Sequence, residues 1–294
     1  MKKILVPCDF SALSIEAFKV ALDIASRVHG EITVLFAIDL PVFVGGFDLQ
    51  PYVYDPTLAY EMKEWAEKKY HELASLNSHH TPMKFCAEQA SVPEAVRRTI
   101  GDRQIDLVVI GTHGTHGANE YMFGSNAEKI VRFSTVPVLS VRSAVPLSSI
   151  KKILFPTDLS SNHPSLIQRL KKLQEFFGAS LDVLWVNTPE NFRTDGEIRA
   201  LMADFVHETN LKNYSLYIAN DEDKEGGILN YADRSKADMI AMATHGRRGL
   251  SHLLNGSLAE DVVNHTDLPI WTFSLHHEKY VTKLHKKIAR EIES

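Results

Sequence analysis

The sequence repeats itself once, and this repeat limits the fold more than any other feature. Four landmarks recur in the same order in both halves of the chain. They are ILVPCDFS (4–11) and ILFPTDLS (153–160), GTHG (111–114) and ATHG (243–246), GS (124–125) and GS (256–257), and VPV (136–138) and LPI (268–270). A period this long exceeds the roughly 20–50 residues of a solenoid repeat, so it predicts two copies of one domain.

The chain length agrees with this duplication. Domains usually hold about 100–200 residues, so 294 residues predict two of them. The second half is shorter between its first two landmarks, and the missing length matches 40–60, which is rich in Pro, Gly and aromatic residues. We expect 40–60 to be a loop that covers the first-half site or packs on a neighbouring subunit. The boundary between the halves is placed at 144–149.

Continuous apolar runs alternate with helix-period stretches in each half. The runs predict strands covered on both faces, as in a parallel sheet. In the first half they are Ile4 to Val6, Ile32 to Ile38, Leu107 to Ile110 and Val136 to Val141. The first helix of each half follows a predicted N-cap, which is Ser11 in one half and Ser161-Asn162 in the other. The alternation predicts two tandem doubly wound α/β domains, each with the order β-α-β-α-β-α-β-α-β.

The composition narrows the class of protein. Apolar residues make up 44% and charged residues 23%, as in a globular protein. The net charge of −5, without any block of Lys and Arg, argues against nucleic acid as a partner. No apolar run approaches the roughly 18 residues of a membrane span, and the first residues are too polar for a signal peptide. With only Cys8 and Cys86, we expect a cytoplasmic protein without a disulfide framework.

Small and acidic residues gather where the predicted strands end. Asp9 directly follows the first strand, Gly111 and Gly114 follow the fourth, and Gly124-Ser125 opens the next helix. In a doubly wound sheet these carboxyl ends meet at one edge, where ligands bind. The glycines leave backbone amides open to a ligand. The start of the helix at Gly124-Ser125 attracts an anion. The carboxylate oxygens of Asp9 can accept hydrogen bonds from ribose hydroxyls or an adenine amino group. The pattern predicts a nucleotide site.

A purely structural interpretation of the same residues stays open. Two pairs have capping-box spacing: Ser125 with Glu128, and Ser257 with Glu260. The glycines could be turn residues, and Asp9 and Asp158 could cap the first helices. Because the whole set recurs at the same strand ends in both halves, the ligand interpretation is favoured.

Together these motifs resemble the universal stress protein family. The pattern G-x2-G-x9-G-[ST], with P-x-D-x-S before it, is matched by Pro7, Asp9, Ser11, Gly111, Gly114, Gly124 and Ser125. The second half is similar through Pro156, Asp158, Ser160, Gly246, Gly256 and Ser257. The resemblance implies universal stress protein-like domains at 1–145 and 150–275, and a charged tail at 276–294. Each domain would be Rossmann-like, of the adenine nucleotide alpha hydrolase type, with a five-stranded parallel sheet between helices.

The resemblance also implies a bound adenine nucleotide: ATP, or else AMP or ADP, which Mg²⁺ could accompany. By similarity, Asp9 would hold the ribose and the backbone at Ala37 would meet the adenine. The ribose and phosphates would be surrounded by Ile110, Gly111, Gly114, Gly124, Ser125 and Asn126. The second-half counterparts would be Asp158, Val186, Met242, Ala243, Gly246, Gly256, Ser257 and Leu258.

The two predicted sites differ. Ala243 stands where the first glycine is expected, and its methyl group would narrow the approach of a ligand. The second half carries Arg247 and Arg248, of which a guanidinium could pair with phosphate, whereas the first half has no cation there. We expect the first half to be the stronger site. The family resemblance further implies that the last strands, Val138 to Val141 and Ile270 to Phe273, could pair within one chain; a homodimer is also open.

Three functions are compatible with the sequence. The favoured one is a nucleotide-binding stress-response protein whose occupancy modulates its protein partners, which the sequence does not name. A slow ATPase or phosphotransferase would need a metal-holding carboxylate and a base, and neither can be identified, so we assign no catalytic and no metal-binding residues. The motifs G-x4-G-K-[ST], H-E-x-x-H and G-x-S-x-G do not occur. A ligand-free scaffold is the third alternative.

Overall fold

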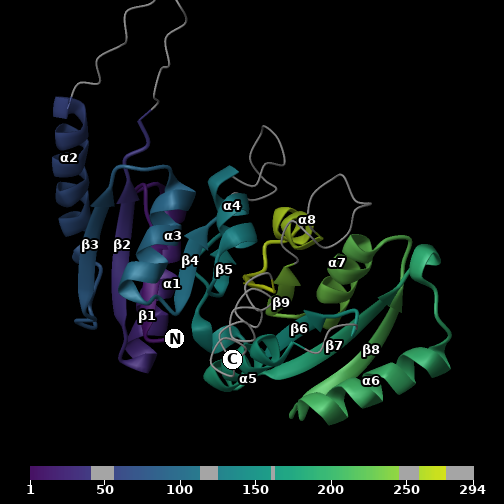
Figure 1. The fold of residues 1–294 in the computed structure, drawn as a ribbon. Coiled ribbons are helices and arrows are strands. Elements are labelled where there is room, and N and C mark those ends of the chain that lie inside the picture. Colours follow the sequence, from purple (N-terminus) through teal and green to yellow (C-terminus); the bar gives the residue numbers. More distant parts are fainter. Residues whose placement is uncertain (41–55, 113–124, 160–162, 245–257, 276–294) are drawn as a thin grey trace, which may run out of the picture. The chain divides into compact units, whose positions relative to one another are not determined.

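The computed structural model describes residues 1–40, 56–112, 125–159, 163–244 and 258–275 (Figure 1). The chain divides into two compact units, Met1–Gly111 and Thr112–Ser294. Both are α/β units, as the alternating sequence pattern predicts. In the part of the chain that the structure describes, no helix is long and apolar enough to span a membrane.

The described strands of the first unit form a parallel sheet in the order β3-β2-β1-β4. The elements are β1 (Lys3–Pro7), α1 (Ala12–Val28), β2 (Glu31–Ala37), α2 (Pro56–Ala74), β3 (Met83–Glu88), α3 (Val92–Arg103) and β4 (Leu107–Gly111). β1 lies between β2 and β4, with Pro7 opposite Leu35 and Leu5 opposite Val108. Its residues Ile4, Leu5 and Val6 are fully buried, which explains why the strand is an uninterrupted apolar run.

The helix α1 begins where the sequence predicts. The hydroxyl of Ser11 caps it by accepting a hydrogen bond from the Ser14 amide, with 3.4 Å between the atoms. The helix buries Ala17, Phe18 and Ala21 completely and packs against β1 and β4. Its N-terminal end therefore lies near the carboxyl ends of these strands.

The second unit holds the remaining elements. They are α4 (Ser125–Phe133), β5 (Val138–Val141), the 3-10 turn η1 (Leu147–Ser149), β6 (Lys152–Pro156), α5 (Pro164–Phe177), β7 (Ser180–Asn187), η2 (Pro189–Asn191), α6 (Asp195–Thr209), β8 (Tyr214–Asn220), α7 (Lys224–Ser235), β9 (Met239–Thr244), α8 (Leu258–His265) and β10 (Ile270–Ser274). The strand order is β5-β10-β9-β6-β7-β8. All neighbours are parallel except β5 and β10, which are antiparallel, with Leu139 opposite Trp271. The predicted pairing of the two last strands within one chain is thus present.

Three predicted boundaries are wrong by a few residues. The helix α5 begins at Pro164 with His163 as its N-cap, not after Ser161-Asn162, because proline suits the first helical position. The helix α2 begins at Pro56 for the same reason, so the predicted loop at 40–60 ends earlier. The strand β5 begins at Val138, after a proline that has no amide to donate. The tail at 276–294 and most of the 40–60 loop lie outside the described residues.

Candidate functional site

The carboxyl ends of β1, β2 and β4 lie at one edge of the first unit, because the three strands are parallel. Asp9 follows β1, Ala37 ends β2, and Ile110 and Gly111 end β4. Asp9 is exposed, Ala37 and Gly111 are half-buried, and Ile110 is buried. The structure brings these four predicted site residues to one edge, and their role there remains a prediction.

The loop after β1 has an uncommon backbone conformation. Phe10 has a φ of 61°, in the left-handed region that a bulky side chain normally avoids at a cost of roughly 1–2 kcal/mol. Its neighbour Asp9 is fixed by the turn, since its Oδ1 accepts a hydrogen bond from the Ser11 amide at 3.0 Å. The Cys8 amide donates to the Leu35 carbonyl at 2.8 Å and anchors the start of the loop to β2.

The second half repeats this loop. Leu159 has a φ of 56°, and the Thr157 amide donates to the Leu184 carbonyl at 3.0 Å. The hydroxyl of Thr157 accepts a hydrogen bond from the Leu159 amide at 3.2 Å. Both halves therefore hold an aspartate, Asp9 or Asp158, next to a left-handed residue at the end of the first strand.

The carboxyl group of Asp9 is held in its charged form. Partial removal from water would raise its pKa, but hydrogen bonds from Ser11 and Ser14 outweigh that effect, so the pKa lies below its ordinary value. An ionised, exposed carboxylate can only accept hydrogen bonds. It suits a hydroxyl or amino donor of a ligand. The neighbouring thiol of Cys8 is buried, which raises its pKa and keeps it protonated, so it offers no nucleophile here.

Gly111 has a packing reason to be glycine. A Cβ atom at this position would lie 2.4 Å from the Leu13 carbonyl oxygen and 2.6 Å from its carbonyl carbon. Those atoms belong to the backbone of α1, so the first turn of the helix can approach β4 only because Gly111 has no side chain. This contact is an alternative to the predicted role of Gly111 in exposing amides to a ligand.

The second unit brings the corresponding strand ends together. Asp158 follows β6, Val186 lies near the end of β7, and Met242 and Ala243 lie near the end of β9. Asp158 is exposed, Ala243 is half-buried, and Val186 and Met242 are buried. The alanine that replaces glycine is accommodated inside β9, opposite Phe273 of β10. Leu258 is the first residue of α8 and half-buried.

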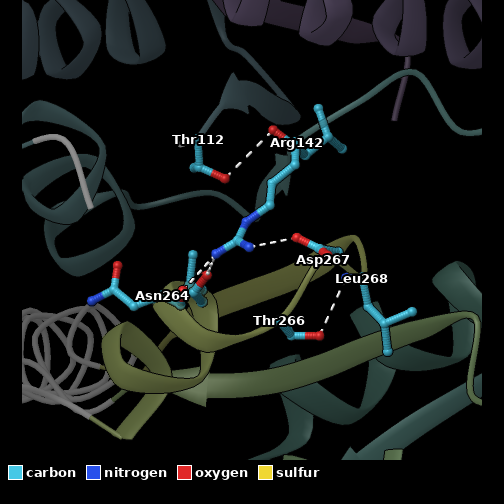
Figure 2. Close-up of polar contacts among 8 residues, drawn as sticks. Thr112, Arg142, Asn264, Thr266, Asp267 and Leu268 are labelled. Carbon is cyan, nitrogen blue, oxygen red and sulfur yellow. Dashed lines mark hydrogen bonds and ion pairs between the residues drawn. The ribbon is translucent and has the colours of Figure 1, made fainter. Parts of the chain in front are cut away.

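The helix α8 is fixed at its C-terminal end by Arg142 (Figure 2). The Arg142 guanidinium donates to the carbonyls of Val263 and Asn264 at 3.1 and 2.6 Å, and to Oδ1 of Asp267 at 2.6 Å. A cation at this end satisfies carbonyls that the helix leaves unpaired and opposes the negative end of its dipole. Arg142 therefore ties the residue after β5 to the helix whose N-terminal end carries predicted site residues.

A second contact ties α8 to α7. Nδ1 of His265 lies 2.5 Å from Oε1 of Glu225. The pKa of Asp261 is raised, mainly because its carboxyl group is partly buried and also because the charges of Glu225 and Glu260 lie nearby. His265 has the opposite effect and lowers this pKa. These contacts place three acidic residues, Glu225, Glu260 and Asp261, along one helix pair.

Several predicted site residues lie outside the described part of the chain. They are Gly114, Gly124, Gly246, Arg247, Arg248, Gly256 and Ser257. Ser125 begins α4 and Asn126 is exposed on it; both belong to the second unit, whereas Asp9 belongs to the first. The sequence interpretation missed Arg142 and His265. Their partners are distant in sequence, and no local spacing signals such contacts.

Comparison with known proteins places the chain in a family. The profile of the universal stress protein family matches residues 1–142 and again 149–273. A universal stress protein of Synechocystis is 22% identical, over 93% of this chain and 100% of its own length. One from Methanocaldococcus jannaschii is 30% identical over 48% of this chain and 82% of its own length. The crystal structure of a universal stress protein from Archaeoglobus fulgidus shares the fold, with a TM-score of 0.72 at 20% identity over 93% of this chain and 98% of that one. The chain therefore belongs to the universal stress protein family and carries two copies of its domain.

Proposed function

We propose that this chain binds an adenine nucleotide, in the first place ATP, at the strand-end edge of its domains. Occupancy of the site would alter its choice of protein partners during a stress response. The observation that carries the proposal is the loop repeated after β1 and β6, in which Asp9 and Asp158 stand next to left-handed residues. The same strained conformation next to an aspartate in both copies supports a shared role of this loop in binding.

The chemistry of the described edge supports a ribose rather than a phosphate at the aspartates. The ionised carboxylate of Asp9 accepts hydrogen bonds and would repel an anion. The proposed phosphate seat is the helix starts at Ser125 and Leu258 with the glycine loops before them, where free amides favour negative charge. Mg²⁺, when bound, would offset part of the triphosphate charge. We propose the first half as the stronger site.

Mass spectrometry of the purified, denatured protein tests the proposal directly. We expect ATP or AMP to be released, and we expect the melting temperature to rise in millimolar ATP with Mg²⁺, since a ligand that binds only the folded state stabilises it. The variants Asp9→Asn and Asp158→Asn should each reduce that shift. Asp233→Asn is the matched control, because this carboxylate is exposed on α7 and pairs with Lys236.

The glycine loops allow a second test of the first half. Gly114→Val and Gly124→Val should remove nucleotide binding there while unfolding stays cooperative. Normal binding by both variants would overturn the first-half assignment.

A ligand-free scaffold is the second candidate, and the close contact between Gly111 and Leu13 favours it. That contact explains one glycine of the motif without any ligand. An empty protein whose melting temperature is unchanged in millimolar ATP with Mg²⁺ would decide for the scaffold. Multiple turnover of ATP, abolished by Asp9→Ala, would instead show a slow ATPase.

We also propose domains at 1–145 and 150–275, a cytoplasmic location and a homodimer. Limited proteolysis should cut first between the two domains. Size measurement by analytical ultracentrifugation tests the homodimer.

A further inference from the structure

The strand β8 is the outermost strand of the second-unit sheet (Figure 1). Within the described part of the chain it pairs only with β7. Its sequence, YSLYIAN, contains no charged residue. Three of its large side chains remain partly open to solvent: Tyr214 at 38%, Leu216 at 36% and Tyr217 at 39%. An uncharged, apolar edge of this length is a template for another strand.

The backbone of β8 shows which groups this edge offers. The Asn213 carbonyl accepts from the Leu181 amide, and the Asp221 amide donates to the Asn187 carbonyl. Odd-numbered residues of β8 therefore point their amides and carbonyls toward β7. In an extended strand successive residues alternate, so Tyr214, Leu216, Ile218 and Asn220 point theirs outward.

The equivalent strand of the first unit protects its edge. β3 (MKFCAE) is also at the end of its sheet, but it carries Lys84 and Glu88. Lys84 pairs with Glu31 at 2.7 Å and Glu88 with Arg98 at 3.2 Å, which keeps charge on that surface. Natural sheets commonly block edge pairing with such charges. Because the corresponding edge strand of the other domain copy is charged, the uncharged edge of β8 indicates a binding surface.

We propose that β8 pairs antiparallel with β8 of a second copy of this chain, with the two-fold axis at Tyr217. This register places Leu216 opposite Ile218 of the other copy and Tyr214 opposite Asn220, which are the residues whose backbone groups point outward. Ser215 then faces Ala219, and the two Tyr217 rings meet at the axis. The strand is thus complementary to itself in both backbone and side chains.

The charges beyond the strand ends are complementary in an antiparallel pair. Lys212 precedes β8 and Glu222 follows it, so the pairing brings the Lys212 end of each strand to the Glu222 end of the other copy, twice by symmetry. Both side chains are exposed. Within one chain the strand between the two residues spans about 20 Å, so they cannot pair with each other.

Disulfide trapping tests the register, in a Cys86→Ser background of the full chain. In a non-hydrogen-bonded antiparallel pair the Cα atoms lie about 4.5 Å apart, within reach of a disulfide. Tyr217→Cys should therefore form a disulfide-linked dimer under mild oxidation. Ser215→Cys is the matched control on the same face of the strand: its two copies would lie about 13 Å apart, too far to cross-link. Equal cross-linking of the two variants, or none by Tyr217→Cys, would overturn the proposal.

Charge reversal tests the same interface without altering the strand. Sedimentation equilibrium should show a dimer for the natural chain and a dissociation constant raised about tenfold by Lys212→Glu, since two exposed ion pairs become repulsions. Lys212→Glu with Glu222→Lys should restore the natural value. Lys84→Glu on β3 is the control and should leave dimerisation unchanged. A monomer at all concentrations, or failure of the double variant to recover, contradicts the β8 interface. The interface builds on the proposed homodimer, but these measurements need no nucleotide, so they stand or fall independently of the proposed nucleotide binding.

Discussion

Arg142 and Asp267 form an ion pair across 125 residues of sequence, with 2.6 Å between Nη1 and Oδ1. The side chain of Arg142 is only 8% exposed, whereas that of Asp267 is 66% exposed. The buried part of the arginine is occupied with the carbonyls at the C-terminal end of α8. The guanidinium of Arg142 therefore makes two different interactions: it caps the C-terminal end of α8, and it forms an ion pair with Asp267 at the surface.

The cap should contribute more to stability than the ion pair. Arg142→Met leaves the carbonyls of Val263 and Asn264 without their donor, so we expect the free energy of unfolding to fall by about 2–3 kcal/mol. Asp267→Asn removes only the exposed pair and should cost about 1 kcal/mol or less. Urea denaturation of both variants measures the difference. Equal losses would mean that the ion pair, not the cap, fixes α8.

The Asp9 carboxylate should give the protein a stability that acid removes. Its pKa lies below the ordinary value of 3.8 because hydrogen bonds from Ser11 and Ser14 favour the charged form in the folded state. The contribution is therefore complete above that ordinary value and is lost as the pH falls through the folded value. We expect the stability difference between the natural chain and Asp9→Asn to shrink between pH 5 and pH 2. A difference that stays constant over this range would contradict the assignment.

The charged carboxylate of Asp182 should destabilise the protein, in contrast to that of Asp9. It is 4% exposed within β7, and burial raises its pKa, although Lys152 and the hydroxyl of Tyr231 oppose the shift. An acid whose pKa is raised on folding destabilises the protein once the pH exceeds its ordinary value of 3.8, and the penalty is full above the folded value. Asp182→Asn should therefore be more stable than the natural chain at pH 7, with the gain vanishing in acid. Thermal unfolding between pH 3 and pH 7 measures it.

The variant Tyr231→Phe tests how the Tyr231 hydroxyl affects the charge of Asp182. The hydroxyl of Tyr231 lies 3.4 Å from Oδ2 of Asp182 and favours its charged form, while its ring packs on Tyr217. Its removal should raise the pKa of Asp182 further and lower stability at pH 7. In the Asp182→Asn background the same change should cost less, because no charge remains to be stabilised.

The sequence predicted what depends on local or periodic signals. The buried strands follow from continuous apolar runs, and the cap at Ser11 follows from a side chain three residues from its amide partner. The start of α5 was wrong because a Ser-Asn cap and a proline compete there, and Pro164 wins. Contacts such as that of Arg142 with Asp267 could not be predicted, since only the folded chain brings the two residues together. At the candidate site the placement of Asp9 could be predicted, but the packing of Gly111 on Leu13 could not.

The pair Gly111 and Ala243 separates packing from ligand binding. In Gly111→Ala the new Cβ would lie 2.4 Å from the Leu13 carbonyl oxygen, so either α1 or β4 must move. Such overpacking costs about 1–3 kcal/mol, which we expect as a loss of unfolding free energy in the absence of nucleotide. Ala243→Gly should cost at most about 1 kcal/mol, the usual entropic cost of glycine in a strand.

The result also decides how the motif should be interpreted. If Gly111→Ala lowers stability while the ATP-induced rise in melting temperature of the variant remains, the first glycine of the motif serves helix packing, and Ala243 is no obstacle to a second-half site. If stability is unchanged and only the ATP effect is lost, Gly111 serves the ligand directly. Ala243→Gly should then strengthen binding in the second half, and titration of the two variants with ATP measures this.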